Sequence, residues 1–139
     1  MLRATEFVLP AIEIVDSRIA DWDLTITDTV ADNASSGAVV LGATPYSLTG
    51  RDLSRVGMTL ERDAEPVSFG AGHACLGSPV VAVAWLAREL IRRAQPLQSG
   101  DVVMSGALGP MVPITAAGRF RLRLDGMGEV DAVIEGNKK

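Results

Sequence analysis

The sequence predicts an α+β domain in which β-strands dominate. Three observations support this fold class: many short segments of strand length, one long amphipathic stretch of helical period, and frequent glycines. The 139 residues are enough to bury a core, and 47% of them are hydrophobic against 22% charged, as in folded globular chains. We expect one domain portion over residues 1–135 and a polar tail over residues 136–139.

The first strand is expected within Phe7 to Val15, where apolar and β-branched residues predominate and Pro10 marks the point after which regular pairing can begin. The two-residue period of a strand sends Glu13 to the face opposite Ile12 and Ile14. One face of this strand is therefore apolar, and the other carries a carboxylate.

Three further strands are expected from their composition. Leu24 to Thr27 alternates between apolar and polar residues, and Ala38 to Leu41 is a short apolar run. Gly100 to Gly106 holds a Val-Val-Met run opened by a Gly-Asp turn.

Two hairpins are predicted with their turns. The first joins Val56–Leu60 to Val67–Phe69 through a polar Arg-Asp-Ala-Glu turn. The second joins Phe120–Leu124 to Val130–Ile134 through a glycine-rich Asp-Gly-Met-Gly turn. Both pairs should form antiparallel ladders.

One main helix is predicted from about Ser78 to Ala94. Ser78 suits the N-cap and Pro79 the first helical position, while Pro96 follows the end. Apolar residues recur on one stripe at helical spacing: Val80, Val83, Ala84, Ala87, Leu90 and Ile91. We expect this stripe to pack on a core and the arginine-rich side to be solvated.

Charge and cysteine content exclude several classes of partner. The net charge is -4 and the basic residues are scattered or lie on one helix, so we expect no nucleic-acid partner. The single cysteine, Cys75, excludes an internal disulfide and suits a reducing, cytoplasmic location. No uninterrupted apolar run reaches membrane-spanning length and the N-terminus lacks a signal-peptide pattern, so we expect no membrane partner.

Carboxylates and hydroxyls gather in residues 10–18 and 28–37, among small and apolar neighbours. Glu13 is the first candidate, because a strand can hold its carboxylate rigidly toward a hard cation such as Mg²⁺ or Mn²⁺. The alternative is a rim glutamate on a half-exposed strand. Asp16 and Arg18 favour a structural ion pair.

The second stretch has the composition of a loop that approaches a ligand closely. Asp28, Asp32 and Asn33 are followed by small residues that end in glycine. Ser35 and Ser36 are able to donate hydrogen bonds to an oxyanion. The alternative is turn chemistry, in which these side chains satisfy the local backbone.

The glycine-rich segment Gly70–Gly77 precedes the main helix but lacks the Lys-Ser or Lys-Thr pair of a phosphate-binding loop. His73 is the only histidine, which excludes a histidine-based metal cluster. We interpret His73 as uninvolved in chemistry and Cys75 as buried and inert.

Specific motifs over almost the whole chain carry a family resemblance. They are Pro10–Ile19, residues 28–37, Gly70–Pro79, Ala82–Ala87 and Gly100–Pro113. Together they resemble the 2-keto-4-pentenoate hydratases, which belong with the 4-oxalocrotonate decarboxylases in the fumarylacetoacetate hydrolase superfamily. The Gly-Ala-Leu-Gly-Pro-Met motif within the last segment is more similar to the hydratases.

The resemblance implies a fold and a reaction. The fold is a mixed β-sheet roll, and the reaction adds water to 2-hydroxypenta-2,4-dienoate, giving 4-hydroxy-2-oxopentanoate in the meta-cleavage breakdown of aromatic compounds. A divalent ion, Mg²⁺ or Mn²⁺, chelates the 2-oxo acid and acts as a Lewis acid. The resemblance implies that Glu13 is a metal ligand, that Asp32 and Ser35 are catalytic, and that Asn33, Ser35 and Ser36 bind substrate.

The chain departs from the family pattern in length. Family members run to about twice this length, and their upstream half supplies a Glu-x-Glu metal pair and a lysine that this sequence lacks. The chain is therefore expected to be a C-terminal half with an incomplete roll, little or no activity alone, and a tendency to form homo-oligomers. Lesser departures are His73, where a small residue is expected, and Ala116–Arg119, where a Gly-Asp turn is usual.

Two alternatives to the hydratase stay open. One is a 4-oxalocrotonate decarboxylase or another 2-oxo acid enzyme on the same scaffold. The other is a non-catalytic half-domain that acts as a structural partner of a complete relative.

Overall fold

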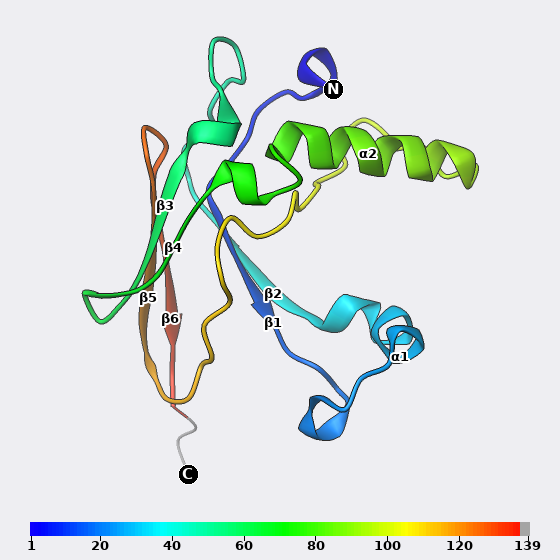
Figure 1. Ribbon diagram of the computed structural model, residues 1–139. Helices are drawn as coiled ribbons and strands as arrows, with labels where there is room; N and C mark the ends of the chain where they lie inside the picture. Colours follow the sequence, from blue (N-terminus) through cyan, green and yellow to red (C-terminus); the bar gives the residue numbers. More distant parts are fainter. Residues whose placement is uncertain (137–139) are drawn as a thin grey trace.

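The computed structural model describes residues 1–136 and is of the α+β class, mainly β, as predicted (Figure 1). The strands are β1 (Ala11–Val15), β2 (Ser36–Leu41), β3 (Gly57–Arg62), β4 (Glu65–Ala71), β5 (Gly118–Leu124) and β6 (Gly128–Ile134). The α-helices are α1 (Ile26–Ala31) and α2 (Pro79–Arg92). Short 3-10 turns lie at Leu2–Ala4, Ala20–Trp22, Asn33–Ser35, Leu53–Arg55 and Gly72–Ala74.

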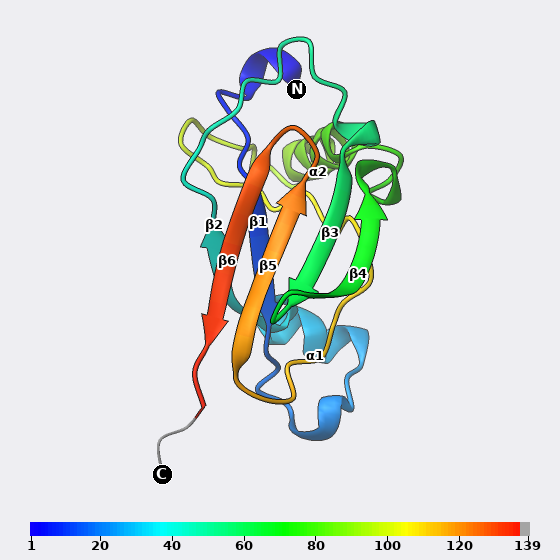
Figure 2. The same cartoon turned by 90° about the vertical axis from the view of Figure 1, so that its left-hand side faces the viewer.

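The strands form two antiparallel sheets. The larger has the order β4-β3-β5-β6, and the smaller is a ribbon of β1 and β2 that lies behind it (Figure 2). Both predicted hairpins are present. Asp63 and Ala64, between β3 and β4, have φ of 51° and 73°, the left-handed conformation of tight hairpin turns. Gly126 and Gly128 supply positive φ at the β5–β6 turn.

The β5–β6 hairpin alternates cleanly between two environments. Its inward side chains are almost fully buried: Phe120, Leu122, Val130 and Ala132. Its outward side chains are the charged ones: Arg119, Arg121, Arg123, Glu129 and Asp131. A second apolar cluster at one end of the sheet consists of Leu48, Leu53, Val56 and Met127. The two-residue period therefore gives the sheet its core face and its charged face.

The predicted strand at 100–106 is wrong, because no strand of the described chain pairs with it. The coil that follows runs along the edge of β4 instead. The Ala71 amide donates to the Leu108 carbonyl at 2.9 Å, and the Ser68 hydroxyl donates to the Pro110 carbonyl at 2.9 Å. A Cβ at Gly70 would lie 1.9 Å from the Leu108 oxygen, so only glycine allows this approach. The coil thereby covers one exposed sheet edge.

The predicted strand at Leu24–Thr27 is also wrong. Thr25 caps helix α1: its hydroxyl accepts from the Asp28 amide at 3.2 Å, and the Asp28 carboxylate accepts from the Thr25 amide at 2.9 Å. This reciprocal capping box satisfies two backbone donors and outweighs the alternating pattern.

The main helix is confirmed, but it extends away from both sheets (Figure 1). Only Pro79 and Ala82 are fully buried on it, while Trp85 is 52% and Ile91 63% exposed. The stretch Gly72–Arg92 is apolar and long enough to cross a membrane by length and composition, with a mean hydropathy of 1.5. Large apolar side chains of α2 are thus exposed in the part of the chain that the structure describes.

Candidate functional site

Glu13 lies on the exposed face of the β1–β2 ribbon. It pairs with Val39, while Val15 pairs with Ser36 two residues further along β1. Facing residues of an antiparallel pair share a side, so Ser36 lies on the Glu13 side, about 7 Å further along the strand. The predicted orientation of Glu13, opposite the half-buried isoleucines of β1, is confirmed.

A bulge at Gly37 makes this arrangement possible. The register shifts between Ile14 and Val15, and Gly37 is the unpaired residue. A Cβ at Gly37 would lie 2.9 Å from the Ile14 carbonyl oxygen and 3.0 Å from the Asp16 Cβ. The backbones approach too closely there for a side chain.

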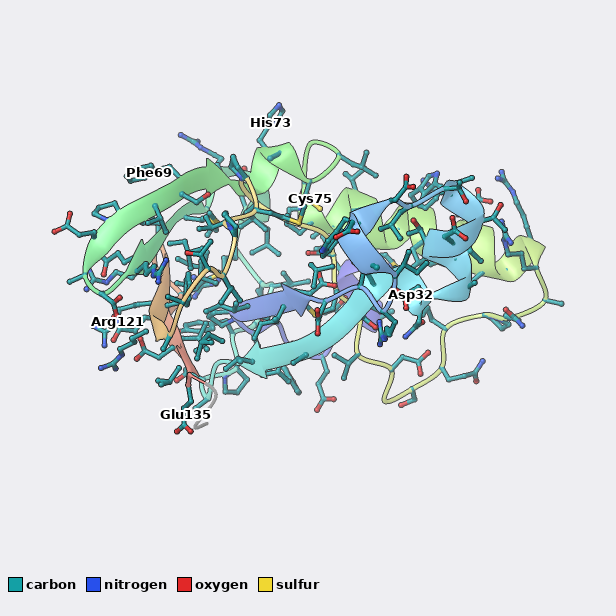
Figure 3. All side chains as sticks on the ribbon, turned by 90° about the horizontal axis from the view of Figure 1, so that it is seen from below. Asp32, Phe69, His73, Cys75, Arg121 and Glu135 are labelled. Atoms are coloured by element: carbon teal, nitrogen blue, oxygen red, sulfur yellow. The ribbon has the colours of Figure 1, made fainter. Side chains whose placement is uncertain are left out.

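Asp32 is the hub of the polar cluster, at the point where β2 meets the helical segment (Figure 3). Ser17 and Ser35 each donate a hydroxyl hydrogen bond of 2.9 Å to its Oδ2 atom. The Arg18 amide donates to the same oxygen at 3.3 Å, and the Arg18 Nη1 atom lies 3.4 Å from Oδ1. The Asp32 side chain is only 7% exposed, so these groups have largely replaced water around it.

These partners decide the charge of Asp32. Burial alone raises the pKa of its carboxyl group, but hydrogen bonds from Ser35, Ser17 and the Arg18 amide, with the Arg18 charge, outweigh burial and lower it. Asp32 is therefore ionised at neutral pH, and its Oδ2 atom accepts three hydrogen bonds. Such a carboxylate is suited to holding its neighbours in place more than to exchanging protons.

The backbone after Asp32 is strained. Asn33, Ala34 and Ser35 have φ of 52°, 55° and 54°, three successive left-handed residues with no glycine among them. Each left-handed residue of this kind costs roughly 1–2 kcal/mol, so the surroundings must hold the segment. The Ser35 carbonyl accepts from the Asp16 amide at 2.8 Å, and the Ser35 amide donates to the Asp32 carbonyl at 2.9 Å.

The hydroxyls of the two neighbouring serines differ in availability. Ser35 is 2% exposed and its proton is committed to Asp32. Ser36 is half-buried and accepts from the exposed Asn33 side-chain amide at 3.0 Å. The predicted residues are thus brought together, with Asn33 and Ser36 outward and Asp32 and Ser35 inward.

Ser17 and Arg18 lie in the polar stretch 10–18, but sequence reasoning did not pair either of them with Asp32. The expected Asp16–Arg18 ion pair is wrong: Arg18 pairs with Asp32, and it reaches Asp16 only through the backbone carbonyl, at 3.3 Å. The Asp-Ser-Arg run directly after a strand was the available signal, but its partner lies 14 residues away in the sequence. Local spacing could not show that contact.

A divalent cation needs several oxygen ligands gathered around one point. Within residues 1–136 no three His, Cys, Asp or Glu side chains gather closely enough to hold a metal ion. Glu13 fits as one hard oxygen ligand, and Mg²⁺ requires a near-octahedral set. Among the described residues, Glu13 therefore offers one ligand of this kind and not a complete set.

His73 and Cys75 lie apart from this cluster, near the start of α2 (Figure 3). His73 is exposed, and the Cys75 thiol is buried and donates to the Ser105 carbonyl. Burial raises the pKa of the thiol, which keeps it protonated and unreactive. A shallow pocket of about 240 Å³ lies beside it, lined by Leu76, Ala82, Val83, Trp85, Leu86, Val103, Met104, Ser105 and Gly106.

Comparison with known families assigns the fold. Residues 4–135 match the fumarylacetoacetate (FAA) hydrolase C-terminal family, and the chain belongs to this family. It is 54% identical over 138 residues to the 2-keto-4-pentenoate hydratase of Paraburkholderia xenovorans, covering 99% of this chain and 51% of that relative. It is 45% identical to the 2-hydroxyhexa-2,4-dienoate hydratase of Comamonas testosteroni, covering 92% and 48%.

Solved structures agree with this family. The 4-oxalocrotonate decarboxylase from Pseudomonas putida G7, complexed with magnesium and adipate, superposes with a TM-score of 0.85 at 35% identity, covering 90% of this chain and 48% of that one. The same enzyme complexed with calcium and acetate gives a TM-score of 0.81. The chain spans about half the length of the relatives it matches, and the predicted resemblance to a C-terminal half of the hydratases is confirmed.

Proposed function

We propose that this chain forms part of the active site of a hydratase that adds water to 2-hydroxypenta-2,4-dienoate, giving 4-hydroxy-2-oxopentanoate in aromatic catabolism. The observation that carries the proposal is the 54% identity to a 2-keto-4-pentenoate hydratase over 99% of the chain. The β1–β2 ribbon supports it, because one face carries Glu13 and Ser36 together. The substrate class is a small 2-oxo or 2-hydroxydienoic acid in the cytoplasm.

Glu13 is proposed as one carboxylate ligand of a divalent metal, Mg²⁺ or Mn²⁺. Its exposure, its place on a strand and its oxygen chemistry suit a hard cation. When bound, such an ion supplies Lewis-acid stabilisation of the negative charge that develops on a chelated 2-oxo acid. The other ligands are proposed to come from the half of the enzyme that this chain does not span.

The polar cluster is proposed to hold the substrate. Asn33 and Ser36 face outward and offer an amide and a hydroxyl to the substrate carboxylate. Asp32 stays ionised and fixes Ser17 and Ser35, so we revise its proposed role from catalytic residue to positioning residue. Ser35 then acts through its backbone and its bond to Asp32, because its hydroxyl proton is already committed.

Turnover measurements distinguish a complete active site from a half-site, meaning one that needs residues from a second half of the enzyme. With one carboxylate offered to the metal, the purified chain with Mn²⁺ should show little or no loss of the dienoate ultraviolet absorbance. Mixing it with the separately produced N-terminal half of the Paraburkholderia xenovorans relative should restore turnover. Activity of the isolated chain equal to that of the full-length relative would contradict the half-site, and no activity in the mixture would contradict the hydratase.

A decarboxylase is the second candidate, supported by the TM-score of 0.85 with 4-oxalocrotonate decarboxylase. Both reactions start from a metal-chelated 2-oxo acid, so the same ribbon serves either. Offering the reconstituted mixture 4-oxalocrotonate and the dienoate separately distinguishes them. Release of carbon dioxide with no hydration of the dienoate would assign the decarboxylase.

A non-catalytic structural partner, or a homo-oligomer, is proposed from the exposed apolar residues. Ile26 and Val30 on α1 are 80% and 75% exposed, and Trp85 on α2 is 52% exposed. Apolar surface of this kind is typical of an interaction site. Light scattering at micromolar concentration should give more than the monomer mass, and a monomer mass would contradict self-association.

A further inference from the structure

Arg18 makes more contacts than a surface ion pair needs. Its Nη2 atom donates to the Ser36 carbonyl at 2.7 Å, and its Nη1 atom donates to the Asp16 and Asp32 carbonyls, each at 3.3 Å. The same Nη1 atom faces the Asp32 carboxylate at 3.4 Å. One guanidinium thus joins the end of β1, the hub and the start of β2, although its side chain is 57% exposed.

The strained residues lie inside this set of contacts. The left-handed run Asn33–Ser35 begins directly after one carbonyl that Arg18 binds and ends directly before another. Asp32 holds the same run from within, through the Ser35 hydroxyl. Strained backbone persists only when its surroundings over-determine it, and these two side chains provide those restraints.

We propose that Arg18 is a positioning residue of the candidate site: with Asp32 it holds residues 33–35 left-handed, and so fixes Ser36 on the Glu13 side of the ribbon with Asn33 bound to its hydroxyl. The Arg18 Nη1 and Nη2 atoms already donate to three backbone carbonyls, so this role requires no bound ligand. The consequence for substrate binding rests on the proposed function, whereas the positioning itself does not.

Amide hydrogen exchange measures how firmly residues 33–35 are held, and it needs no substrate. The reporters are the Asp16 amide, which donates to Ser35, and the Ser35 amide, which donates to Asp32. Arg18→Ala should accelerate both by at least about tenfold while the β5–β6 amides keep their wild-type rates, because the change is local. Arg18→Lys keeps the positive charge but not the forked set of donors, so its exchange rates should lie between those of the wild type and Arg18→Ala. Arg123→Ala, on the outer face of the large sheet, is the matched control.

A second variant separates positioning from ordinary stabilisation. Glycine adopts left-handed φ without strain, so Ala34→Gly placed in the Arg18→Ala chain should bring both reporters back to within roughly threefold of wild type. Wild-type exchange in both Arg18 variants would overturn the proposal. Faster exchange that Ala34→Gly does not restore would also overturn it, because Arg18 would then be only a stabilising contact. If Arg18→Ala does not fold, Arg18→Lys is compared with and without Ala34→Gly, and the exchange rates of the same two amides test the proposal.

Discussion

The four-stranded sheet and the β1–β2 ribbon place their charges differently. On the sheet, Arg119 and Arg121 share Asp131 across the outer surface at 2.6 and 2.8 Å, while apolar residues fill the inner face. Beside the ribbon, by contrast, the charged side chain of Asp32 is only 7% exposed, and the hydroxyls of Ser17 and Ser35 and the Arg18 guanidinium surround it.

This difference indicates that the large sheet stabilises the fold, whereas the ribbon and its polar cluster form the candidate site. Apolar burial contributes most of the sheet's stability, and each surface ion pair adds little to it. A two-stranded ribbon has marginal stability by itself. The polar contacts beside this ribbon hold a strained segment of backbone. We therefore expect core substitutions in the sheet to unfold the chain, and ribbon substitutions to alter the site while the sheet persists.

The largest effect is expected from Phe120→Ala. Phe120 is 4% exposed on the inner face of β5, and removing a buried aromatic ring costs about 3–5 kcal/mol of unfolding free energy. Urea denaturation followed by circular dichroism measures the loss. Val133→Ala on the neighbouring strand, at a position 68% exposed, should change stability by less than about 0.5 kcal/mol. Equal losses in the two variants would show that the inner face is not the core.

An intermediate effect is expected from Gly37→Ala. The new methyl group would meet the Ile14 carbonyl oxygen at 2.9 Å, and relieving that contact should cost about 1–3 kcal/mol. The disturbance should appear in the ribbon, as faster amide exchange in β1 and β2 with unchanged exchange in β5 and β6. Gly136→Ala, where the nearest atom is 3.7 Å away, is the control. Exchange that rises equally in both sheets would contradict the separation of the two regions.

A smaller effect is expected from acid. Hydrogen bonds from Arg119 and Arg121 hold the pKa of Asp131 far below its usual value of 3.8 in the folded chain. Ionised Asp131 therefore stabilises the folded chain fully above about pH 4. This stabilisation is lost as the pH falls below that value, because the Asp131 carboxylate of the unfolded chain is protonated at a higher pH than that of the folded chain.

Asp131→Asn should remove this part of the acid dependence at a cost of about 1 kcal/mol at neutral pH. Urea midpoints at pH 6 and pH 3 measure it. Asp23→Asn is the control, because Asp23 is an exposed aspartate outside the large sheet. An acid dependence that is unchanged in Asp131→Asn would show that other carboxylates carry it.

Local chemistry made part of the fold predictable. Both hairpins follow from turn residues beside alternating strands, and α2 follows from Pro79 and its apolar period. The errors have two causes. At Leu24–Thr27 the capping box of Thr25 overrode the alternation, and at 100–106 an apolar run found no strand to pair with.

The candidate site was predictable as a set of residues but not as a geometry. Composition drew attention to Asp32, Asn33 and the two serines, since polar groups in such surroundings need partners. It could not show that Arg18 closes the cluster or that residues 33–35 are left-handed, because both depend on chain segments 14 to 18 residues apart. Family resemblance supplied the proposed roles, and the structure supplied the contacts.

Manganese affinity of the reconstituted mixture is the most direct test of the central claim, that Glu13 is one ligand of a metal site shared between two halves. We expect Glu13→Gln to weaken Mn²⁺ binding by at least about tenfold and to remove the rise in Tm that Mn²⁺ produces, because the variant lacks a charged ligand. Glu135→Gln, an exposed glutamate just after β6, should bind Mn²⁺ like the wild type. Wild-type Mn²⁺ affinity in Glu13→Gln would contradict the claim.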